Sequence, residues 1–263
     1  MARIWVVVPA YNEEDGLPKV VEAVHQNLTA DGHEVHFVVV NDGSRDRTQE
    51  VAEELSKTYP MTILHHPVNQ NIGAVWRDGL TEAATQAARL PPHADGSKNL
   101  IFTCEGDNTC DMSILKEMAH RLIEGYDIVM ASRYQRGGRI DGFPFMRRVY
   151  SWVINWMLRI LYPLPGATDY SIFVRGYRAA IVQRALAYYG ADFIESVGFV
   201  ANAEVLVKMR RFDPRCASIS MYYCYQQKGG GSKLNVRKTI TEYFRFFLRN
   251  RRTAIKYRNK SIA

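Results

Sequence analysis

The sequence predicts an α/β fold in which a mostly parallel sheet is flanked by helices. Over about residues 1–131, short apolar runs rich in Val and Ile alternate with longer segments whose apolar residues recur at helical spacing. Three of the runs are followed directly by acidic side chains. Strands separated by helices of this length pair in parallel through right-handed crossovers, and ligands bind where the carboxyl ends of such strands meet.

The first half of the chain supplies most of the expected sheet. We expect strands at residues 4–9, 35–40, 61–64, 99–104 and 127–131, and helices at residues 15–28, 46–58, 71–90 and 113–124. The strands are continuous apolar runs, which is the pattern of strands buried on both faces. The first helix is indicated by one apolar stripe, formed by Leu17, Val20, Val21, Val24 and Leu28.

The composition changes after residue 133, where two glycine-rich basic loops accompany aromatic-rich segments. We expect helices at residues 145–161, 177–189, 197–211 and 236–252, and a strand at residues 217–226. The chain is therefore predicted to form one domain at residues 1–235, followed by a basic amphipathic helix at residues 236–263. Within the domain, residues 1–133 form a nucleotide-binding half and residues 134–235 an acceptor-binding half.

Composition and charge exclude several classes of protein. The chain has 263 residues, of which 47% are apolar and 23% charged, so it suits a large globular domain rather than a disordered segment. The net charge of +7 favours anionic partners, but no nucleic-acid motif is recognised, and nucleic acid is not an expected partner. No apolar stretch reaches the ~18 residues of a membrane span, so we expect a soluble or membrane-peripheral protein. The four cysteines fit no zinc signature and are expected to be free thiols in a reducing cytoplasm.

The first motif follows the strand at residues 4–9 and consists of Pro9, Ala10, Tyr11, Asn12 and Glu13. Tyr11 offers a ring for stacking, and Glu13 offers a carboxylate that can accept hydrogen bonds from a ribose or a base. The same residues also suit the start of a helix, with Asn12 as the N-cap and acidic residues in the first turn. Both interpretations stay open at this point.

The second motif is Asn-Asp-Gly-Ser, in which Asp42 comes at the end of the second strand. Asp42 can accept hydrogen bonds from a nucleobase or ribose, and Gly43 allows a close approach of the backbone. The same residues also suit a simple turn, and the absence of Gly-x-Gly-x-x-Gly disfavours a dinucleotide site. His65 and His66 end the next strand, and without spaced partners they are expected to be turn residues rather than zinc ligands.

The third motif is formed by Glu105, Gly106 and Asp107, directly after a buried strand. Side chains at positions i and i+2 of an extended chain point the same way, so both carboxylates can face one cation. Oxygen ligands of this kind suit Mg²⁺ or Mn²⁺, which take substrate phosphates as further ligands. We therefore expect Glu105 and Asp107 to hold a divalent cation that bridges a diphosphate, while Asp111 caps the next helix.

These three motifs, in this order and spacing, resemble the glycosyltransferase family 2 enzymes with a GT-A fold, over about residues 3–235. The resemblance implies a Rossmann-like, mostly parallel sheet with C-terminal amphipathic helices, a nucleotide-diphosphate sugar as donor, and Mg²⁺ or Mn²⁺ as cofactor. It assigns nucleotide binding to residues 9–13, Asp42, Gly43 and Gly106, and a catalytic role to Asp107.

Within that family, three further segments resemble the polyprenol (dolichyl) phosphate mannose synthases. They are Ala-Ser-Arg-Tyr-x-x-Gly-Gly at residues 131–138, Phe-Pro-Phe-Met-Arg-Arg-Val-Tyr-Ser at residues 143–151 and the basic glycine loop at residues 228–233. The resemblance implies a polyprenyl phosphate acceptor and a peripheral position on the inner, cytoplasmic face of the membrane. It also implies five side chains that meet the acceptor phosphate, the first two of them catalytic: Arg133, Arg147, Ser151, Lys228 and Lys233.

The chain departs from the family pattern at the metal site, at Thr109, where the family often has Gln, and at a segment that bears on the sugar and acceptor. Glu105 stands where the family usually has Asp, and residues 169–175 replace the usual Ser-Gly-Phe-Arg. A lipid phosphate is already ionised, so the enzyme would need arginines and a metal to align two anions for an inverting single displacement, but no general base. A soluble hydroxyl acceptor is the alternative, and it would need a base, for which Asp169 or Glu195 is a candidate.

The helices expected at residues 145–161 and 236–252 are candidates for membrane contact. The first carries Trp152 and Trp156 beside arginines, which suits a membrane interface or, alternatively, an ordinary core-facing position. The second is rich in Arg and Lys, which suits an anionic leaflet or, alternatively, a solvated surface or a dimer contact.

Overall fold

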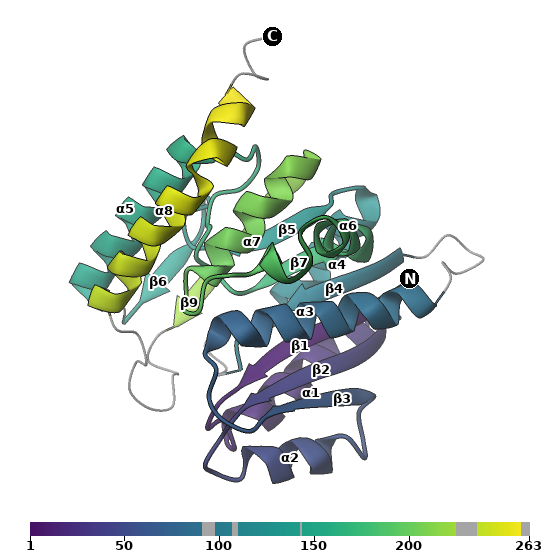
Figure 1. Ribbon diagram of the computed structural model, residues 1–263. Helices are drawn as coiled ribbons and strands as arrows, with labels where there is room; N and C mark the ends of the chain where they lie inside the picture. Colours follow the sequence, from purple (N-terminus) through teal and green to yellow (C-terminus); the bar gives the residue numbers. More distant parts are fainter. Residues whose placement is uncertain (91–97, 107–109, 143, 225–235, 259–263) are drawn as a thin grey trace.

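A seven-stranded sheet runs through the centre of the molecule, with helices on both faces and a two-stranded sheet at one side (Figure 1). The computed structural model describes residues 1–90, 98–106, 110–142, 144–224 and 236–258, and at residues 236–238 and 252–258 it describes the backbone alone. Three predicted site residues, Asp107, Lys228 and Lys233, therefore lie outside the described residues.

The first half confirms the predicted alternation of strands and helices, with small shifts at their ends. The strands are β1 (Ala2–Ala10), β2 (Glu34–Asp42), β3 (Met61–His66), β4 (Lys98–Thr103), β5 (Ile128–Ser132), β6 (Arg139–Asp141), β7 (Arg175–Arg178), β8 (Cys216–Ser220) and β9 (Tyr222–Cys224). The helices are α1 (Gly16–Thr29), α2 (Thr48–Leu55), α3 (Ile72–Arg89), α4 (Ile114–Glu124), α5 (Phe145–Leu161), α6 (Ala179–Tyr189), α7 (Ala201–Met209) and α8 (Val236–Arg258), with short 3₁₀ helices η1 (Gly190–Phe193) and η2 (Arg210–Phe212).

The main sheet has the strand order β3-β2-β1-β4-β7-β5-β8 and is parallel except for β7. Helices α3, α6 and α7 pack together over one face, and α1, α2 and α4 lie over the other (Figure 1). This coverage on both faces explains why β1 and β2 are almost continuously apolar. Because β1, β2, β4 and β5 run in the same direction, their carboxyl ends meet at one edge, and the sequence motifs follow these ends.

Strand β7 lies between β4 and β5, although the sequence pattern does not predict it. Its sequence, Arg-Gly-Tyr-Arg, is polar, and residues 177–178 fall in a segment where a helix is expected. Arg175 is 2% exposed, and its guanidinium donates to the carbonyl oxygens of Asn202 (2.6 Å) and Tyr170 (2.7 Å). The Phe102 ring occupies the space that a side chain at Gly176 would need. Tertiary contacts thus allow a polar strand in the core.

Two elements differ from the sequence prediction in the second half. The strand expected at residues 217–226 is divided between the main sheet, as β8, and the small sheet, as β9. The chain changes sheets at Met221, whose N–H donates to the carbonyl oxygen of Ser132 and whose own carbonyl accepts from the N–H of Arg139. The helix expected at residues 197–211 begins later, as α7, and ends in the 3₁₀ turn η2.

Helix α7 is buried along its whole length although it carries Glu204 and Lys208. The Glu204 carboxylate accepts the N–H groups of Glu195 (3.0 Å) and Ser196 (2.7 Å) and lies 2.9 Å from the Lys208 ammonium. That ammonium also lies 2.8 Å from the Glu195 carboxylate. Arg249 of α8 reaches Glu204 at 3.5 Å. This network joins α7, the segment before it and the C-terminal helix.

We predict that Glu204→Gln lowers the free energy of unfolding by roughly 3 kcal/mol, because the buried Lys208 ammonium loses its buried counter-charge. Urea-induced unfolding measures the change. Glu195→Gln is the matched control, because its carboxylate contacts the same ammonium but its side chain is 37% exposed. The control should cost less than about 1 kcal/mol, and equal losses in the two variants would contradict the prediction.

Candidate active site

Hydrogen bonds join the loop after β1 to the loop after β2. The N–H of Asn12 donates to Ser44 Oγ (3.0 Å), and Asn12 Oδ1 accepts from the N–H of Arg45 (2.8 Å). The N–H of Glu13 donates to Thr48 Oγ1 (2.8 Å). The interpretation of Asn12 as a helix N-cap is therefore wrong. Its side chain instead fixes the first two motifs against each other.

Asp42 is 3% exposed at the end of β2, and its carboxylate is directed toward the loop after β3. Oδ1 accepts from the N–H of Gln70 (2.8 Å), and Oδ2 accepts from the N–H of Asn71 (3.0 Å). Oδ1 also lies 2.7 Å from Nδ1 of His66, the neighbour of Asp42 across the β2–β3 pairing. His66 is therefore a buried strand residue, and its prediction as a turn residue is wrong. Its ring lies between the carboxylates of Asp42 and Asp78.

The segment after β4 passes close to the first motif. A side chain at Gly106 would clash with the carbonyl oxygen of Pro9, so only glycine fits this approach. Glu105, next to it, is 9% exposed. Burial and, to a smaller extent, the charge of Glu105 raise the pKa of the Cys104 thiol to about 12. Cys104 is therefore a packing residue rather than a nucleophile.

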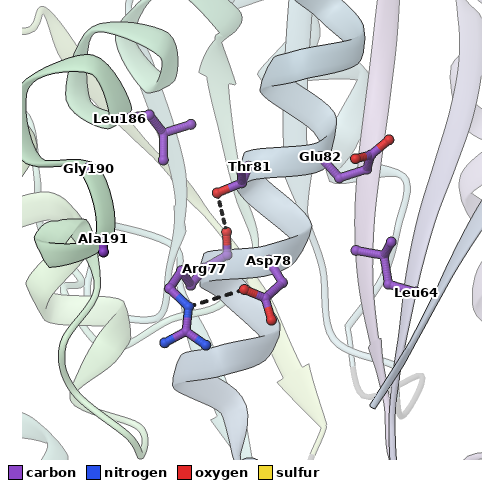
Figure 2. Close-up of a pocket in the computed structure, with 8 residues that line it drawn as sticks. All are labelled: Leu64, Arg77, Asp78, Thr81, Glu82, Leu186, Gly190 and Ala191. Atoms are coloured by element: carbon purple, nitrogen blue, oxygen red, sulfur yellow. Dashed lines mark hydrogen bonds and ion pairs between the residues drawn. The ribbon is translucent and has the colours of Figure 1, made fainter.

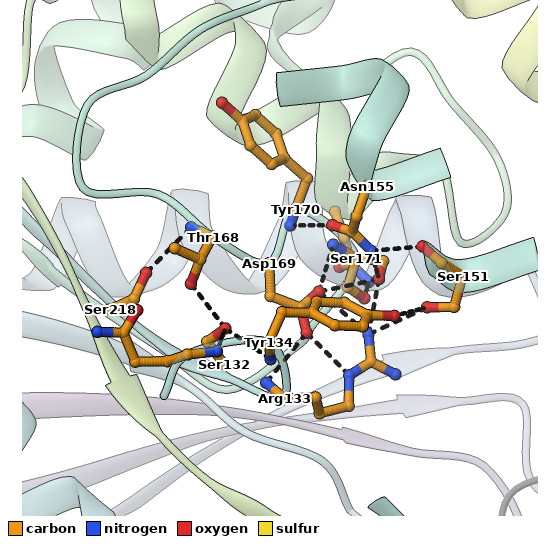
Figure 3. A network of polar contacts seen from close by, with 12 residues as sticks. Ser132, Arg133, Tyr134, Ser151, Asn155, Thr168, Asp169, Tyr170, Ser171 and Ser218 are labelled. Atoms are coloured by element: carbon orange, nitrogen blue, oxygen red, sulfur yellow. Dashed lines mark hydrogen bonds and ion pairs between the residues drawn. The ribbon is translucent and has the colours of Figure 1, made fainter. Parts of the chain in front are cut away.

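Arg133 follows β5, and its guanidinium pairs with the buried carboxylate of Asp169. Nε lies 2.8 Å from Oδ2, and Nη2 lies 3.0 Å from Oδ1. Nη2 also donates to Ser171 Oγ (2.7 Å) and lies 3.4 Å from Ser151 Oγ, which accepts from the Tyr134 hydroxyl at 2.8 Å. Figure 3 shows these side chains directed toward one another from the end of β5, from α5 and from residues 168–171.

The two carboxylates that could serve as a general base are both paired with cations. Burial alone would raise the pKa of Asp169, but the charge of Arg133 and hydrogen bonds from Arg133 and Ser171 outweigh burial and hold the pKa below its ordinary value of 3.8. Burial would likewise raise the pKa of Glu195, but Lys208 and then Arg249 lower it. Neither group is suited to accept a proton at neutral pH.

Helix α5 buries the polar side chain of Asn155 and exposes a row of apolar side chains. Asn155 Nδ2 donates to Ser171 Oγ (2.9 Å), and Asn155 Oδ1 accepts from the N–H of Tyr170 (2.6 Å). Arg147 and Ser151 fall on the same helical face as Asn155. The opposite stripe is 37–75% exposed and consists of Phe145, Val149, Trp152, Trp156 and Ile160. A core-facing position for the tryptophans is therefore wrong.

Helix α8 packs against the end of α5 through aromatic side chains. The Tyr162 ring, directly after α5, lies 5.7 Å from the Phe246 ring and 6.3 Å from the Phe247 ring. Three apolar side chains of α8 are 50–64% exposed: Ile240, Phe244 and Leu248. Among the described helices, none has a stretch long and apolar enough to cross a bilayer. The two helices thus carry exposed apolar side chains at one end of the molecule (Figure 1).

A family model of glycosyl transferase family 2 matches residues 5–186, which is more than half of the chain. The chain belongs to glycosyltransferase family 2. It is 27% identical over 247 residues to a dolichol-phosphate mannosyltransferase of Pyrococcus furiosus, covering 94% of the chain and 63% of that protein. It is also 27% identical over 184 residues to a polyprenol monophosphomannose synthase of Mycolicibacterium smegmatis, covering 69% of the chain and 64% of that protein. The chain spans just under two thirds of the length of these relatives.

Solved structures confirm the fold of this family 2 glycosyltransferase. Glucosyl-3-phosphoglycerate synthase from Mycobacterium tuberculosis, in complex with Mn²⁺, UDP and phosphoglyceric acid, matches with a TM-score of 0.62 at 15% identity, covering 96% of this chain and 78% of that one. TarS of S. aureus in complex with UDP-GlcNAc matches with a TM-score of 0.55 at 16% identity, covering 90% and 62%. At these identities the similarity concerns the fold, which is the GT-A fold that the sequence predicts.

The predicted donor residues of this glycosyltransferase lie along one edge of the sheet. Pro9 and Glu13 both border the position of Gly106, and Asp42 ends the strand β2, which pairs with β1 and is followed directly by Gly43. Their contacts with a nucleotide stay a prediction, as do those of Ala10, Tyr11 and Asn12.

The predicted metal and acceptor residues are only partly described. Glu105 lies at the same sheet edge as the predicted donor residues, whereas Asp107 is outside the described residues. Within the described ranges, no group of three or more His, Cys, Asp and Glu side chains could hold a metal ion. Asp111 Oδ1 accepts from the N–H of Ser113 (2.9 Å), but Ser113 is the N-cap of α4 and no side chain caps the helix, so the expected capping role of Asp111 is wrong. Arg133 and Ser151 come together, with Arg147 on the same face of α5 as Ser151.

The contacts of three residues in this site, Asn155, Asp169 and His66, were not predicted from the sequence. Asn155 was detectable as an amide that interrupts an aromatic helix, and it holds that helix to residues 170 and 171. No local signal marks Asp169 as the partner of Arg133, because the two side chains meet only when β5 packs beside the segment before β7. The same is true of His66, which Asp78 of α3 contacts at 3.1 Å.

We predict that Asp169→Asn lowers the free energy of unfolding at pH 7 by about 3–5 kcal/mol, because Arg133 is left as an uncompensated buried charge. The pKa of Asp169 is lower in the folded protein than its ordinary value of 3.8. Its stabilising effect is therefore fully present above pH 3.8 and is lost as the pH falls below that value.

Urea unfolding of wild type and variant at pH 7, 4 and 3 measures this effect. The difference between the two proteins should shrink below pH 4. Asp15→Asn, at an exposed position without a side-chain cap hydrogen bond, is the control and should leave the profile unchanged. A difference that stays constant or grows toward pH 3 would contradict the prediction.

Proposed function

We propose that this protein transfers a sugar from a nucleotide-diphosphate sugar to a polyprenyl phosphate in a single, inverting displacement. The observation that carries the proposal is helix α5, which turns Ser151 and Asn155 toward the Arg133–Asp169 pair and leaves its tryptophans exposed. Arg147 lies one turn before Ser151 on the same helical face. A phosphate attached to a long apolar chain needs both of these surfaces side by side. The names of the two mannose-transferring relatives support the same class of acceptor.

The donor would bind at the sheet edge formed by the three motifs. Residues 9–13 and Asp42, Gly43 and Gly106 would contact the nucleotide, in line with the UDP and UDP-sugar complexes of the structural neighbours. The close approach of Gly106 to Pro9 supports this assignment, because it brings the acidic segment next to the first motif. The direct link between the first two loops would hold the site in shape before the donor arrives.

A divalent cation, Mg²⁺ or Mn²⁺, fits the carboxylate ligands that the chain offers after β4. Glu105 and Asp107 would supply carboxylate oxygens, and the longer side chain of Glu105 starts from a buried backbone position at the end of β4. When bound, the ion would neutralise negative charge on the diphosphate as it leaves. One structural neighbour was solved with Mn²⁺.

The acceptor phosphate would lie between the end of β5 and the polar face of α5. Arg133 and Arg147 are proposed to bind it and to align it with the anomeric carbon, with Ser151 as a hydrogen-bond donor. Lys228 and Lys233 of the second basic loop are proposed to add positive charge. The pairing of Arg133 with Asp169 supports a positioning role, because it fixes the plane of the guanidinium.

The ion pairing of the Asp169 and Glu195 carboxylates favours a phosphate acceptor over a hydroxyl acceptor. A hydroxyl must lose a proton during transfer, whereas a phosphate is already ionised. Asp169 and Glu195, the two candidate bases, are both ion-paired, and their pKa values are lowered. We therefore infer that catalysis rests on alignment and electrostatics rather than on proton removal.

The exposed apolar stripe of α5 is proposed to rest on the cytoplasmic face of a membrane, with the tryptophans at headgroup level. The exposed apolar side chains of α8 and its arginines would extend this contact. In this arrangement the lipid chain stays in the bilayer while its phosphate reaches the inner face of α5.

We predict that Asp107→Ala lowers the rate of sugar transfer to polyprenyl phosphate by about 100-fold or more, since metal stabilisation amounts to several kcal/mol and each 1.4 kcal/mol corresponds to tenfold. The assay follows transfer of labelled sugar from GDP- and UDP-sugars with Mn²⁺. Asp111→Ala, four positions along the chain, is the control and should keep most of the activity. Full activity of Asp107→Ala would sink the proposed function.

We predict that the double variant Trp152→Ser, Trp156→Ser binds vesicles of anionic phospholipid about tenfold more weakly than wild type, because two exposed indole rings no longer enter the interface. Flotation of protein with vesicles in a density gradient measures the bound fraction. Tyr188→Ser is the control, because this aromatic side chain is also 53% exposed but lies on α6. Equal flotation of all three proteins would count against membrane contact through α5.

A further inference from the structure

The carboxylate of Asp42 holds a backbone segment in an unfavourable conformation. Asn71 has φ 71° and ψ 166°, a combination that side-chain-bearing residues rarely adopt and that costs about 1–3 kcal/mol. Such a conformation persists only where the surroundings enforce it. The N–H of Asn71 donates to Asp42 Oδ2 and the N–H of Gln70 to Asp42 Oδ1, so this one side chain binds both peptide groups.

The end of β2 also presses against this segment. An added Cβ at Gly43 would lie 2.6 Å from the backbone nitrogen of Asn69, so the two backbones are in direct contact. The segment at residues 69–71 therefore lies beside the Asp-Gly motif at the edge where the donor nucleotide is proposed to bind. Its shape helps to determine what fits next to Asp42.

His66 connects Asp42 to a second carboxylate. Its Nδ1 lies 2.7 Å from Asp42 Oδ1, and its Nε2 lies 3.1 Å from Asp78 Oδ2. A neutral ring can donate to one of these carboxylates, and only the imidazolium donates to both. The His66 side chain is only 8% exposed, so the ring itself is largely shielded from water. The orientation of the Asp42 carboxylate thus depends on a ring that Asp78 holds from the other side.

Asp78 lies at the other end of this series of contacts from Asp42. It lines a cavity of about 510 Å³ between α3, β3 and the α6–η1 segment, where its Oδ1 accepts from Arg77 Nε at 3.1 Å (Figure 2). Its side chain is 37% exposed, in contrast to the buried Asp42 and His66. A change at Asp78 can therefore alter the orientation of Asp42 without touching a bound nucleotide.

We propose that His66 and Asp78 are positioning residues for the donor nucleotide. They act through Asp42, which in turn sets the conformation of residues 69–71 at the wall of the nucleotide site. This inference rests on the proposed function, because it assumes that the donor binds at this edge. It predicts that changes at the two residues affect nucleotide affinity and the KM of the donor, while kcat at saturating donor is preserved.

Calorimetric titration of GDP and of UDP with Mn²⁺ into the full chain tests the proposal, together with KM and kcat for sugar transfer. His66→Ala should weaken nucleoside diphosphate binding about tenfold, which corresponds to 1.4 kcal/mol. His66→Asn should recover most of this loss, because its amide can still donate to Asp42 from near the position of Nδ1. Asp78→Asn should weaken binding by about threefold, or ~0.7 kcal/mol.

Glu82→Gln is the matched control, because Glu82 belongs to the same helix and lines the same cavity but contacts Gln86 rather than His66. It should bind like wild type. The proposal is overturned if Asp78→Asn, a change at a partly exposed position, binds both nucleotides like wild type. It is also overturned if His66→Asn is no better than His66→Ala, or if kcat falls while KM and affinity stay unchanged. If the wild-type protein binds neither nucleotide, the proposed function fails, and this inference fails with it.

Discussion

The buried ion pair of Arg133 and Asp169 is the interaction on which the second half of the molecule depends. The side chains are 7% and 0% exposed, and an unpaired charge at that depth would cost several kcal/mol. The pair therefore fixes the end of β5 against the segment before β7. Because Ser151 and Asn155 complete the hydrogen bonds around it, the pair also fixes the rotation of α5 about its own axis. That rotation is what leaves the tryptophans of α5 exposed.

The sheet edge that carries the three motifs is organised by a different kind of contact. Its loops are held mainly by hydrogen bonds that backbone N–H groups donate to side-chain oxygens, as from Arg45 to Asn12 or from Asn71 to Asp42. Such bonds fix the backbone and keep unusual conformations in place. The three motifs thus shape one another first, and this shape is what a nucleotide would meet. A residue can be essential to the site here without being the residue that contacts the ligand.

The two halves are connected at the start of α3. The N–H of Gly73 donates to the carbonyl oxygen of Val197 at 2.8 Å, and a side chain at Gly73 would clash with the carbonyl oxygen of Ser196. The N–H of Ser196 is in turn held by the buried carboxylate of Glu204, which Arg249 of α8 also reaches. A continuous set of polar contacts therefore runs from the C-terminal helix to the segment that begins α3, next to the loop that Asp42 holds.

Local sequence patterns were sufficient to predict the alternation of strands and helices, the mostly parallel sheet and the edge at which the motifs gather. Continuous apolar runs and helical stripes are local patterns, and the carboxyl ends of parallel strands meet wherever such strands pair. Four features depend on how the chain packs: β7 enters the centre of the sheet, Asn12 links two loops, His66 joins two carboxylates and Asn155 of α5 faces inward. In each case a polar group is bound by a partner from another segment of the chain, and no local pattern records which partner packing will supply.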